Sequence, residues 1–426
     1  MTALVLGAAV SGRAASALLR ATGEEVVLYD ADPAALEDAD ADRIHGGAWD
    51  AALLAGVDLV VTSPGVPEHA APIQDAIAAG VTLWSELELG FRHLDAPVAA
   101  VTGTNGKTTV TGLAARMLQA SGLRAAAAGN IGDPLSAAVG QQWDALVVEA
   151  SSFQLRFVET FHARAAVLLN VAPDHLDWHG SYEDYAAAKA RILERQTPDD
   201  VVVFDADDPG AASLITAATA RRVPVSGAAL PAGGWGRHGD RLVLGDLEIP
   251  LGDLPRSDAV MLVDIAAAAA AASHMGATAD GIREGAIGFT TGPHRRQVVG
   301  SWDGVTWVDD SKATNPHSAL AAIRDHDSVV LIAGGRNKGL DIGVLPLEPN
   351  LRLVVAIGEA AAELAASGGP VKIAGSLEEA VAIADGTARS GDTVLLAPGC
   401  ASFDMFRSYA DRGDRFAELV RSRKET

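Results

Sequence analysis

The stretch Val98-Ala-Ala-Val-Thr-Gly-Thr-Asn-Gly-Lys-Thr-Thr109 decides how the rest of the chain is interpreted. Residues 98–102 are mostly apolar and predict a buried strand, and a helical pattern follows the stretch to about Ala120. In such a strand–loop–helix context, glycines let successive N–H groups point at a phosphate, while Lys107 supplies a cation and Thr108 a hydroxyl for magnesium. The stretch therefore predicts a phosphate loop. The loop is shortened, because Val101 stands where the usual first glycine would be.

Composition narrows the class of protein. The chain has 426 residues, of which 49% are hydrophobic and 21% are charged, so we expect several folded domains. It carries 33 Lys and Arg against 55 Asp and Glu, a net charge of −22, which argues against nucleic-acid and anionic-membrane partners. The single cysteine, Cys400, excludes an internal disulfide. With no basic, apolar leader at its start, the chain is expected to be cytoplasmic.

Strands alternating with helices divide the chain into three α/β segments with mainly parallel sheets flanked by helices. We place them at residues 1–93, 94–290 and 291–426. Strands are predicted at Ala3–Gly7, Glu25–Tyr29, Val57–Thr62, Val81–Trp84, Ala145–Glu149, Ala165–Leu169, Val201–Asp205, Val305–Val308, Ser328–Ala333, Arg352–Ile357, Val371–Ile373 and Thr393–Ala397. A hairpin is predicted within Trp235–Ile249, and helices at Arg13–Thr22 and Asp411–Arg423. The alanine run Ala266–Ala272 predicts a closely packed helix.

The turn Gly7-Ala-Ala-Val-Ser-Gly12 has two interpretations. It resembles a dinucleotide fingerprint in which Ala9 replaces the second glycine, so it could hold a phosphate at a helix N-terminus with help from Ser11 and Arg13. It could equally be a tight turn only. A nicotinamide-dependent dehydrogenase would begin from this turn, but that class leaves the phosphate loop unexplained.

Two side chains in the middle segment are candidate magnesium ligands. Glu149 ends a predicted strand and His175 follows another, which brings both to the carboxyl edge of one sheet. The carboxylate is the better ligand for a hard cation, and His175 taken alone is better explained as a hydrogen-bonded loop residue. Lys189 lies on a helix, and spacing alone favours a solvated side chain there.

Three polar loops follow predicted strands of the last segment. They are Asp309-Asp-Ser-Lys-Ala-Thr-Asn315, Gly334-Gly-Arg-Asn-Lys-Gly339 and Pro398-Gly-Cys-Ala-Ser-Phe-Asp-Met-Phe406, and His294-Arg295 precedes them. So much polarity at strand ends exceeds what turns require and indicates a ligand site. For Ser402, a helix cap is the alternative to a ligand contact.

These motifs together resemble the Mur ligase family, in order and over essentially the whole chain. The phosphate loop and the 310–315 block are shared across the family. The block Glu149-Ala-Ser-Ser-Phe-Gln-Leu155 and the block 397–406 are similar to the branch that adds D-glutamate. The resemblance implies a Rossmann-like N-terminal domain, a phosphate-loop ATPase domain in the centre and a Rossmann-like C-terminal domain.

The resemblance also implies an activity: ATP-dependent joining of D-glutamate to UDP-N-acetylmuramoyl-L-alanine through an acyl phosphate, with Mg²⁺, by a monomer. The alternative inside the family is another amide ligase, of the Mur or folylpolyglutamate type. The rival outside it is a nucleotide-binding regulator.

Site residues carried over from the resemblance fall into four ligand groups and one catalytic set. ATP is assigned to Gly103, Thr104, Asn105, Gly106, Lys107, Thr108, Thr109, Arg295 and Asp310. The UDP substrate is assigned to Ser11, Gly12, Asp30, Ser63, Gly65, Asn130, Ser151 and Gln154. D-glutamate is assigned to Lys312, Thr314, Lys338, Ser402, Phe403 and Tyr409. Magnesium is assigned to Thr108, Glu149, His175 and Lys189 as a carbamate, and Lys107, Glu149, His175 and Lys189 are the expected catalytic set.

Two departures from the family pattern stand out. Residues 257–265 lack the asparagines expected against adenine, and Arg336 stands where an acidic residue is familiar.

Overall fold

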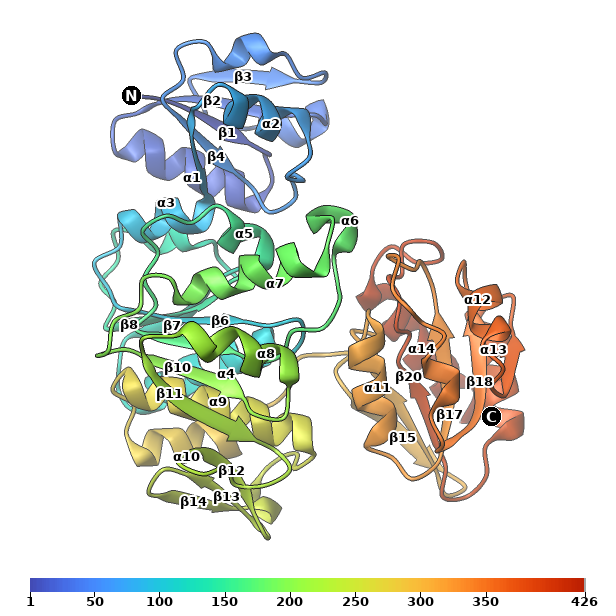
Figure 1. The fold of residues 1–426 in the computed structure, drawn as a ribbon. Coiled ribbons are helices and arrows are strands. Elements are labelled where there is room, and N and C mark those ends of the chain that lie inside the picture. Colours follow the sequence, from blue (N-terminus) through green and yellow to red (C-terminus); the bar gives the residue numbers. More distant parts are fainter. Residues whose placement is uncertain (425–426) are drawn as a thin grey trace. The chain divides into compact units, whose positions relative to one another are not determined.

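The fold is described from a computed structural model, for residues 1–424. The chain forms two compact units. The first contains residues 1–171 and 178–289, and the second contains residues 172–177 together with the chain from Thr290 onward. Three separate sheets make up the molecule, two in the first unit and one in the second (Figure 1). The predicted class, three α/β domains with mainly parallel sheets, is confirmed.

The first sheet has five parallel strands in the order β3-β2-β1-β4-β5. Its elements are β1 Thr2–Leu6, α1 Val10–Ala21, β2 Glu25–Asp30, β3 Arg43–Gly46, β4 Leu59–Thr62, α2 Ala71–Ala78, β5 Thr82–Ser85 and α3 Glu86–Arg92. Alternate residues of β1 enter two different cores, one under α1 and one under α2. Strand β3 was not predicted, because all four of its residues are exposed and give no apolar run.

The central sheet has nine strands in the order β14-β13-β12-β11-β10-β9-β6-β8-β7. Its strands are β6 Val98–Thr102, β7 Ala125–Gly129, β8 Ala145–Glu149, β9 Ala165–Leu168, β10 Val201–Asp205, β11 Arg221–Ser226, β12 Trp235–His238, β13 Arg241–Leu244 and β14 Leu247–Pro250. The accompanying helices are α4 Lys107–Ala120, α5 Ser152–Arg156, α6 Leu176–His179, α7 Tyr182–Ala190, α8 Pro209–Leu214, α9 Ala259–His274 and α10 Ala279–Ile287. The predicted hairpin is one strand longer than expected, since β12, β13 and β14 pair antiparallel in succession.

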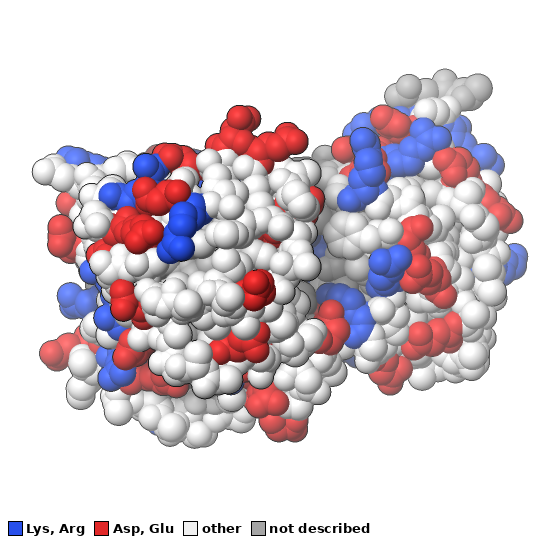
Figure 2. Space-filling view, turned by 90° about the horizontal axis from the view of Figure 1, so that it is seen from above, with Lys and Arg blue, Asp and Glu red and all other residues white. Residues whose placement is uncertain are grey.

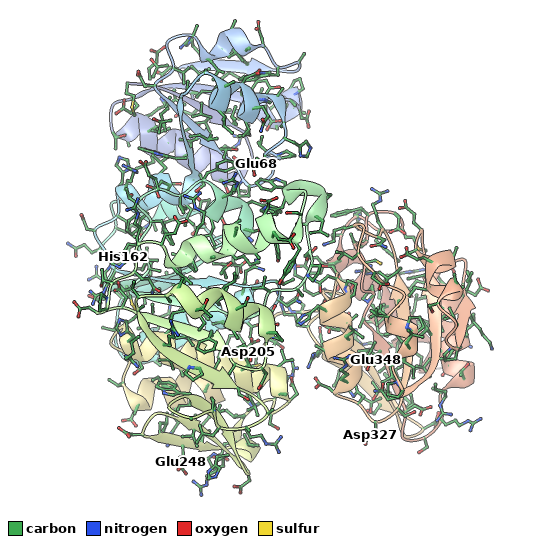
Figure 3. All side chains as sticks on the ribbon, in the orientation of Figure 1. Glu68, His162, Asp205, Glu248, Asp327 and Glu348 are labelled. Carbon is green, nitrogen blue, oxygen red and sulfur yellow. The ribbon has the colours of Figure 1, made fainter. Side chains whose placement is uncertain are left out.

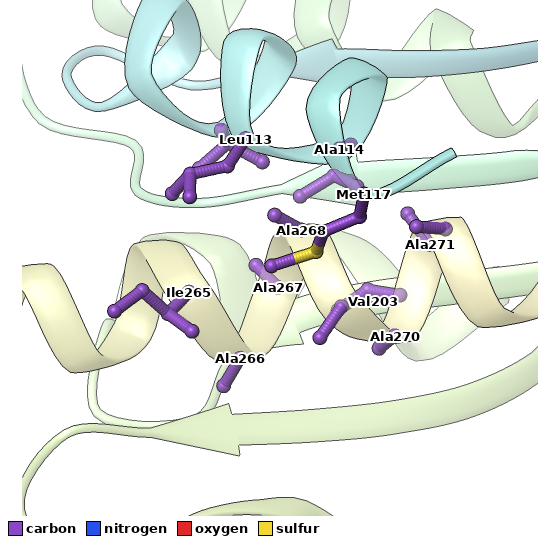
Figure 4. Packing of buried hydrophobic residues seen from close by; sticks show 14 of the residues in the cluster. Leu113, Ala114, Met117, Val203, Ile265, Ala266, Ala267, Ala268, Ala270 and Ala271 are labelled. Atoms are coloured by element: carbon purple, nitrogen blue, oxygen red, sulfur yellow. The ribbon is translucent and has the colours of Figure 1, made fainter. Parts of the chain in front are cut away.

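Helix α9 packs closely against α4, as the alanine run predicts. Met261 to Ala272 are all buried, and Figure 4 shows alanines of α9 beneath Leu113 and Met117 of α4. Small side chains let the two helices approach until a thioether and a leucine fill the remaining space. This packing fixes the position of α4, whose first turn carries the phosphate loop.

The third sheet has six strands in the order β15-β16-β20-β17-β18-β19. Its elements are β15 Gln297–Trp302, β16 Val305–Asp309, α11 Pro316–Arg324, β17 Val329–Gly334, β18 Leu351–Ile357, α12 Ala361–Ala366, β19 Val371–Ile373, α13 Leu377–Thr387, β20 Thr393–Leu396 and α14 Tyr409–Lys424. Only β15 pairs antiparallel, and it was not predicted. Residues of α11 and α12 enter one core and residues of α13 and α14 the other, so both faces of the sheet are covered.

The two compact units differ in two respects from the three independent segments that the sequence predicts. The first two sheets share one compact unit, and residues 172–177 belong with the third sheet. The chain therefore passes between units after residues 171, 177 and 289, and not at one hinge. The boundaries 93/94 and 290/291 stay predictions as domain limits.

Charged side chains of both signs lie side by side on the face drawn in Figure 2. Ion pairs between partly exposed side chains include Arg415–Glu378 and Arg423–Asp385. Among the residues described, no helix combines the length and the apolar character needed to cross a bilayer.

Candidate functional site

The phosphate loop is built on glycines that no other residue could replace without strain. Gly103 and Gly106 have φ values of 155° and 85°. A Cβ on Gly106 would lie 2.8 Å from Asp264 Oδ1 and 2.9 Å from Leu169 Cδ1. Asn170, which follows the neighbouring strand β9, holds the loop by two hydrogen bonds. Its carbonyl accepts from Thr104 N at 2.8 Å, and its Oδ1 accepts from Asn105 N at 2.8 Å.

Lys107 is the first residue of α4 and turns back over the loop. Its Nζ donates to Gly103 O at 2.8 Å and to Thr104 O at 3.0 Å. The N–H groups at the start of α4 and this ammonium together favour an anion at the same place. The geometry agrees with the predicted phosphate loop.

Glu149 ends β8 and is buried beside the loop. Its Oε2 accepts from Thr108 Oγ1 at 2.8 Å, and its Oε1 accepts from Asn130 Nδ2 at 2.9 Å. Mg²⁺ is held in proteins by one or two carboxylates together with phosphate and water oxygens, so an adjacent hydroxyl and carboxylate suit it. Within residues 1–424 no group of three or more His, Cys, Asp or Glu side chains forms a metal cluster.

Lys189 is buried, with 1% of its surface exposed, so a solvated helix lysine is the wrong interpretation. Its Nζ donates to Gly103 O at 2.7 Å and lies 4.5 Å from the centre of the Tyr185 ring. Tyr185 in turn shares a 2.9 Å hydrogen bond with Thr104 Oγ1. Lys107 and Lys189 thus meet at one carbonyl oxygen of the phosphate loop.

In the first sheet, the turn at residues 7–12 is held by two side chains that were expected to touch the substrate. Asp30 Oδ2 accepts from Ala8 N at 2.7 Å, and Ser63 Oγ donates to Gly7 O at 3.4 Å. A Cβ on Gly12 would lie 1.7 Å from Gly7 O, so helix α1 approaches the turn as closely as a glycine allows.

Arg13 holds several backbone carbonyls near the turn of the first sheet. Its guanidinium donates to the carbonyls of Ala8, Ala35, Glu37 and Asp38. These hydrogen bonds hold the segment after β2 against the turn. Assistance to a phosphate therefore stays a prediction for this side chain.

Helix α5 begins with a capping box formed by Ser151 and Gln154. Ser151 Oγ accepts from Gln154 N at 3.2 Å, and Gln154 Oε1 accepts from Ser151 N at 3.1 Å. The Nε2 group of Gln154 is buried and has no hydrogen-bond partner among the residues described. The substrate contacts assigned to Ser151 and Gln154 stay predictions.

In the second unit, the 309–315 loop follows β16. Asp310 accepts from the backbone N–H of Arg296 at 3.2 Å, and its carboxylate is 3.9 Å from Arg296 Nε. Arg296 is thus the arginine beside Asp310, and the ATP contacts assigned to Arg295 and Asp310 stay predictions. Lys312 Nζ lies 3.9 Å from the centre of the Tyr409 ring, which brings together two predicted D-glutamate residues. Thr314 is half-buried in the same loop.

A buried carboxylate, that of Asp174, contacts both the 309–315 loop and the 334–339 loop. It accepts from Lys338 Nζ at 2.7 Å and from Asn315 Nδ2 at 3.0 Å. Burial alone would raise the pKa of Asp174, but the nearby charges of His175 and Lys338 and the hydrogen bonds from Lys338 and Asn315 outweigh it and hold the pKa below its usual value. Sequence reasoning missed Asp174, although it directly precedes His175, a predicted magnesium ligand.

Ser402 does not cap a helix. Helix α14 begins at Tyr409, and the hydroxyl that accepts from its first turn is that of Ser408, from Asp411 N at 3.1 Å. Ser402 is 3% exposed, and its carbonyl accepts from Met405 N and Phe406 N. The helix-cap alternative is therefore wrong, whereas the ligand contact stays a prediction. Phe403 beside it is 67% exposed.

Backbone contacts bring the loops after β17 and β20 together. Arg336 N donates to Ala401 O at 2.9 Å, and Ala401 N donates to Arg336 O at 3.1 Å. The Arg336 side chain pairs with Glu359 at 3.1 Å, which supports the loop in place of the familiar acidic residue. Arg412, a buried residue that sequence reasoning also missed, donates to Ser311 Oγ at 2.9 Å and to Cys400 O at 3.3 Å.

The predicted residues thus fall into two groups. Lys107, Thr108, Glu149 and Lys189 are assembled in the first unit, while His175 and the predicted D-glutamate residues belong to the second. That the two groups serve one reaction stays a prediction.

Comparison with known proteins agrees with the motifs. The Mur ligase middle domain matches residues 101–233, the Mur ligase glutamate ligase domain residues 294–400, and the MurD-like N-terminal domain residues 1–85. The chain is 44% identical to the UDP-N-acetylmuramoylalanine–D-glutamate ligase of Frankia casuarinae, over 99% of this chain and 94% of the relative. It is 40% identical to the enzyme of that name from Mycobacterium avium, over 98% and 96% of the two chains.

Solved structures share the fold at low sequence identity. A pseudomurein peptide ligase of Methanothermus fervidus superposes with a TM-score of 0.64 at 18% identity, over 99% of this chain and 100% of that one. The UDP-N-acetylmuramate-alanine ligase of Thermotoga maritima gives 0.61 at 18% identity, over 100% of both chains. Taken with the long matches to curated relatives, these findings show that the chain belongs to the Mur ligase family.

Proposed function

We propose that the protein is an ATP-dependent amide ligase that joins D-glutamate to UDP-N-acetylmuramoyl-L-alanine in the synthesis of peptidoglycan precursors. The observation that carries the reaction type is the phosphate loop with Lys107, Thr108 and Glu149 in contact around it. The choice of substrates is supported by the names of relatives that match over nearly the full length.

The chemistry follows from the poor reactivity of a carboxylate. Its oxygen takes the γ-phosphoryl group of ATP, which gives an acyl phosphate and ADP. The uncharged amine of D-glutamate then attacks the carbonyl carbon, the C–O bond breaks, and inorganic phosphate leaves with that oxygen. In phosphoryl transfer the protein contributes positioning and charge neutralisation. Lys107 and the first N–H groups of α4 are the groups that neutralise the phosphates.

Magnesium would be held by Thr108 and Glu149, whose oxygens already lie together. We expect His175 and carbamylated Lys189 to complete the set. Bound there, the ion would neutralise phosphate charge. Asn130 fixes the orientation of the Glu149 carboxylate from the opposite side.

D-glutamate has two carboxylates, and we assign them to Lys338, Thr314 and the Ser402 loop, with Lys312, Phe403 and Tyr409 around them. The UDP moiety is assigned to Ser11, Gly12, Asp30, Ser63 and Gly65. We further expect a cytoplasmic monomer that binds neither nucleic acid nor membrane.

Phosphate release from ATP tests this function. Rapid release should require both UDP-N-acetylmuramoyl-L-alanine and D-glutamate, and Lys107→Ala should lower it by several orders of magnitude while the protein stays folded. Release with a different amino acid would identify a sister ligase. Phosphate release at the same rate with and without both co-substrates would contradict a ligase activity.

A further inference from the structure

Arg156 and Glu68 form an ion pair between segments 88 residues apart. The guanidinium donates from Nε to Glu68 Oε2 at 2.9 Å and from Nη2 to Oε1 at 2.7 Å. Two parallel contacts between planar groups fix orientation as well as distance. Glu68 lies where the first sheet borders the elements of the central one (Figure 3).

Glu68 ends a loop that begins at the carboxyl end of β4. Ser63 N donates to Leu6 O at 3.0 Å, and Val66 N donates to Ser63 O at 3.1 Å. At the far end, Gln74 Nε2 donates to Glu68 O at 2.8 Å. The loop carries Ser63 and Gly65, which are assigned to the UDP moiety, and a Cβ on Gly65 would meet no atom within 4 Å. Glu68 is thus the anchored end of a loop that borders open space.

Arg156 is the last residue of the short helix α5. The first turn of this helix is capped by Ser151 and contains Gln154, which are both assigned to the same nucleotide substrate. Arg191 holds its C-terminal end, because it donates to the carbonyls of Arg156 and Val158. Since α5 has only five residues, a shift at Arg156 moves the whole helix, including the Gln154 amide.

We propose that Arg156 and Glu68 are positioning residues that set the separation between the UDP-holding loop and helix α5, and thereby the affinity for the nucleotide substrate. The inference rests on the proposed function. Neither side chain touches reacting atoms. The two side chains are 44% and 24% exposed, so the pair contributes little to folding stability. Holding two parts of one ligand site in register, in contrast, lowers the ordering cost of binding.

Charge reversal tests the pair. The variants Arg156→Glu and Glu68→Arg should each raise the KM for UDP-N-acetylmuramoyl-L-alanine about two- to fivefold, as expected for one partly exposed ion pair. The kcat and the KM values for ATP and D-glutamate should stay nearly unchanged. The double variant, which restores opposite charges, should recover much of the lost affinity.

The chain offers a matched control in Arg324 and Glu348. This pair has the same two-point geometry, at 3.1 and 2.7 Å, but joins elements of the third sheet's domain. Arg324→Glu should leave all three KM values unchanged. Wild-type KM values in both single variants of the Arg156 pair, or a double variant no better than the worse single one, would overturn the inference.

Equilibrium binding of the nucleotide substrate, measured by calorimetry without ATP, separates this inference from the proposed function. Tight binding to the wild type with no ligation would contradict the proposed function alone. Equal Kd values for the wild type and both single variants would contradict the positioning role alone. Absence of binding to the wild type would overturn both.

Discussion

Two lysine side chains donate to one carbonyl oxygen, that of Gly103, at 2.8 and 2.7 Å. Two ammonium groups so close together repel, and magnesium beside them would add to the repulsion. A carbamate on Lys189 would turn one cation into an anionic oxygen ligand. We therefore expect density beyond Nζ of Lys189 in a crystal of the active, magnesium-bound enzyme. An unmodified lysine in that crystal would contradict the assignment.

Ser402 offers a test of the D-glutamate site. Because its hydroxyl caps no helix, Ser402→Ala should raise the KM for D-glutamate by roughly 10- to 150-fold, the loss of one charge-assisted contact. The KM values for ATP and for UDP-N-acetylmuramoyl-L-alanine should stay unchanged in this variant. Ser408→Ala is the control: it removes the cap of α14 at a cost of about 0.5–2 kcal/mol in unfolding free energy and should spare the D-glutamate KM. A lower melting temperature with an unaltered KM in Ser402→Ala would refute the contact.

Local patterns predicted the residues of the phosphate loop and Glu149, because strand, loop and helix adjoin in the sequence. Asp174 and Arg412 escaped prediction, since their contacts join residues far apart in the chain, Asp174 with Lys338 and Arg412 with Ser311. The role of Lys189 came from family resemblance, as spacing alone pointed to solvent.

At the scale of elements, the contact between α4 and α9 depends on small side chains. Ala268 is fully buried in it. Ala268→Leu should lower the free energy of unfolding by about 1–3 kcal/mol, because the added carbons have no space. Ala17→Leu on the exposed side of α1 should have little effect. Chemical denaturation of both variants checks this, and equal stabilities would contradict the close packing.

Asp205, at the carboxyl end of β10, makes stability depend on pH. Burial raises its pKa to about 7, helped by the charges of Asp207 and Asp208 and opposed by the N–H of Asp207. As pH rises from about 4 to about 7, the unfolded state loses its proton first, so the folded state loses stability. Asp205→Asn should remove that loss and stabilise the protein above pH 7 by about 1–2 kcal/mol, after allowance for solvent screening. Melting temperatures of the wild type and Asp205→Asn, measured at acid and at alkaline pH, check this. A difference between the two proteins that is the same at both pH values would contradict the prediction.

Apolar runs predicted the buried parallel strands such as β6, β8 and β17, since both of their faces are covered. Strand β7, of sequence Ala-Ala-Ala-Ala-Gly, gave no such signal because alanine favours helices. Strands β3 and β15 lie at sheet edges, where exposure removes the apolar pattern.

For the whole molecule, the order of three α/β domains could be predicted, but the interleaving of its units could not. Residues 172–177 follow a strand of the central sheet and yet belong with the third sheet, because Asp174 bonds to Lys338 and Asn315. Any rotation of the third sheet's unit must therefore bend the chain near residues 171, 177 and 289 together.

The central claim is that the protein activates a carboxylate as an acyl phosphate. It is tested most directly by following oxygen-18 from the carboxylate of labelled UDP-N-acetylmuramoyl-L-alanine during one turnover with ATP and D-glutamate. The mechanism predicts that each phosphate released carries one labelled oxygen, because that oxygen leaves with the phosphoryl group. Phosphate free of label, with ATP consumed, would contradict it.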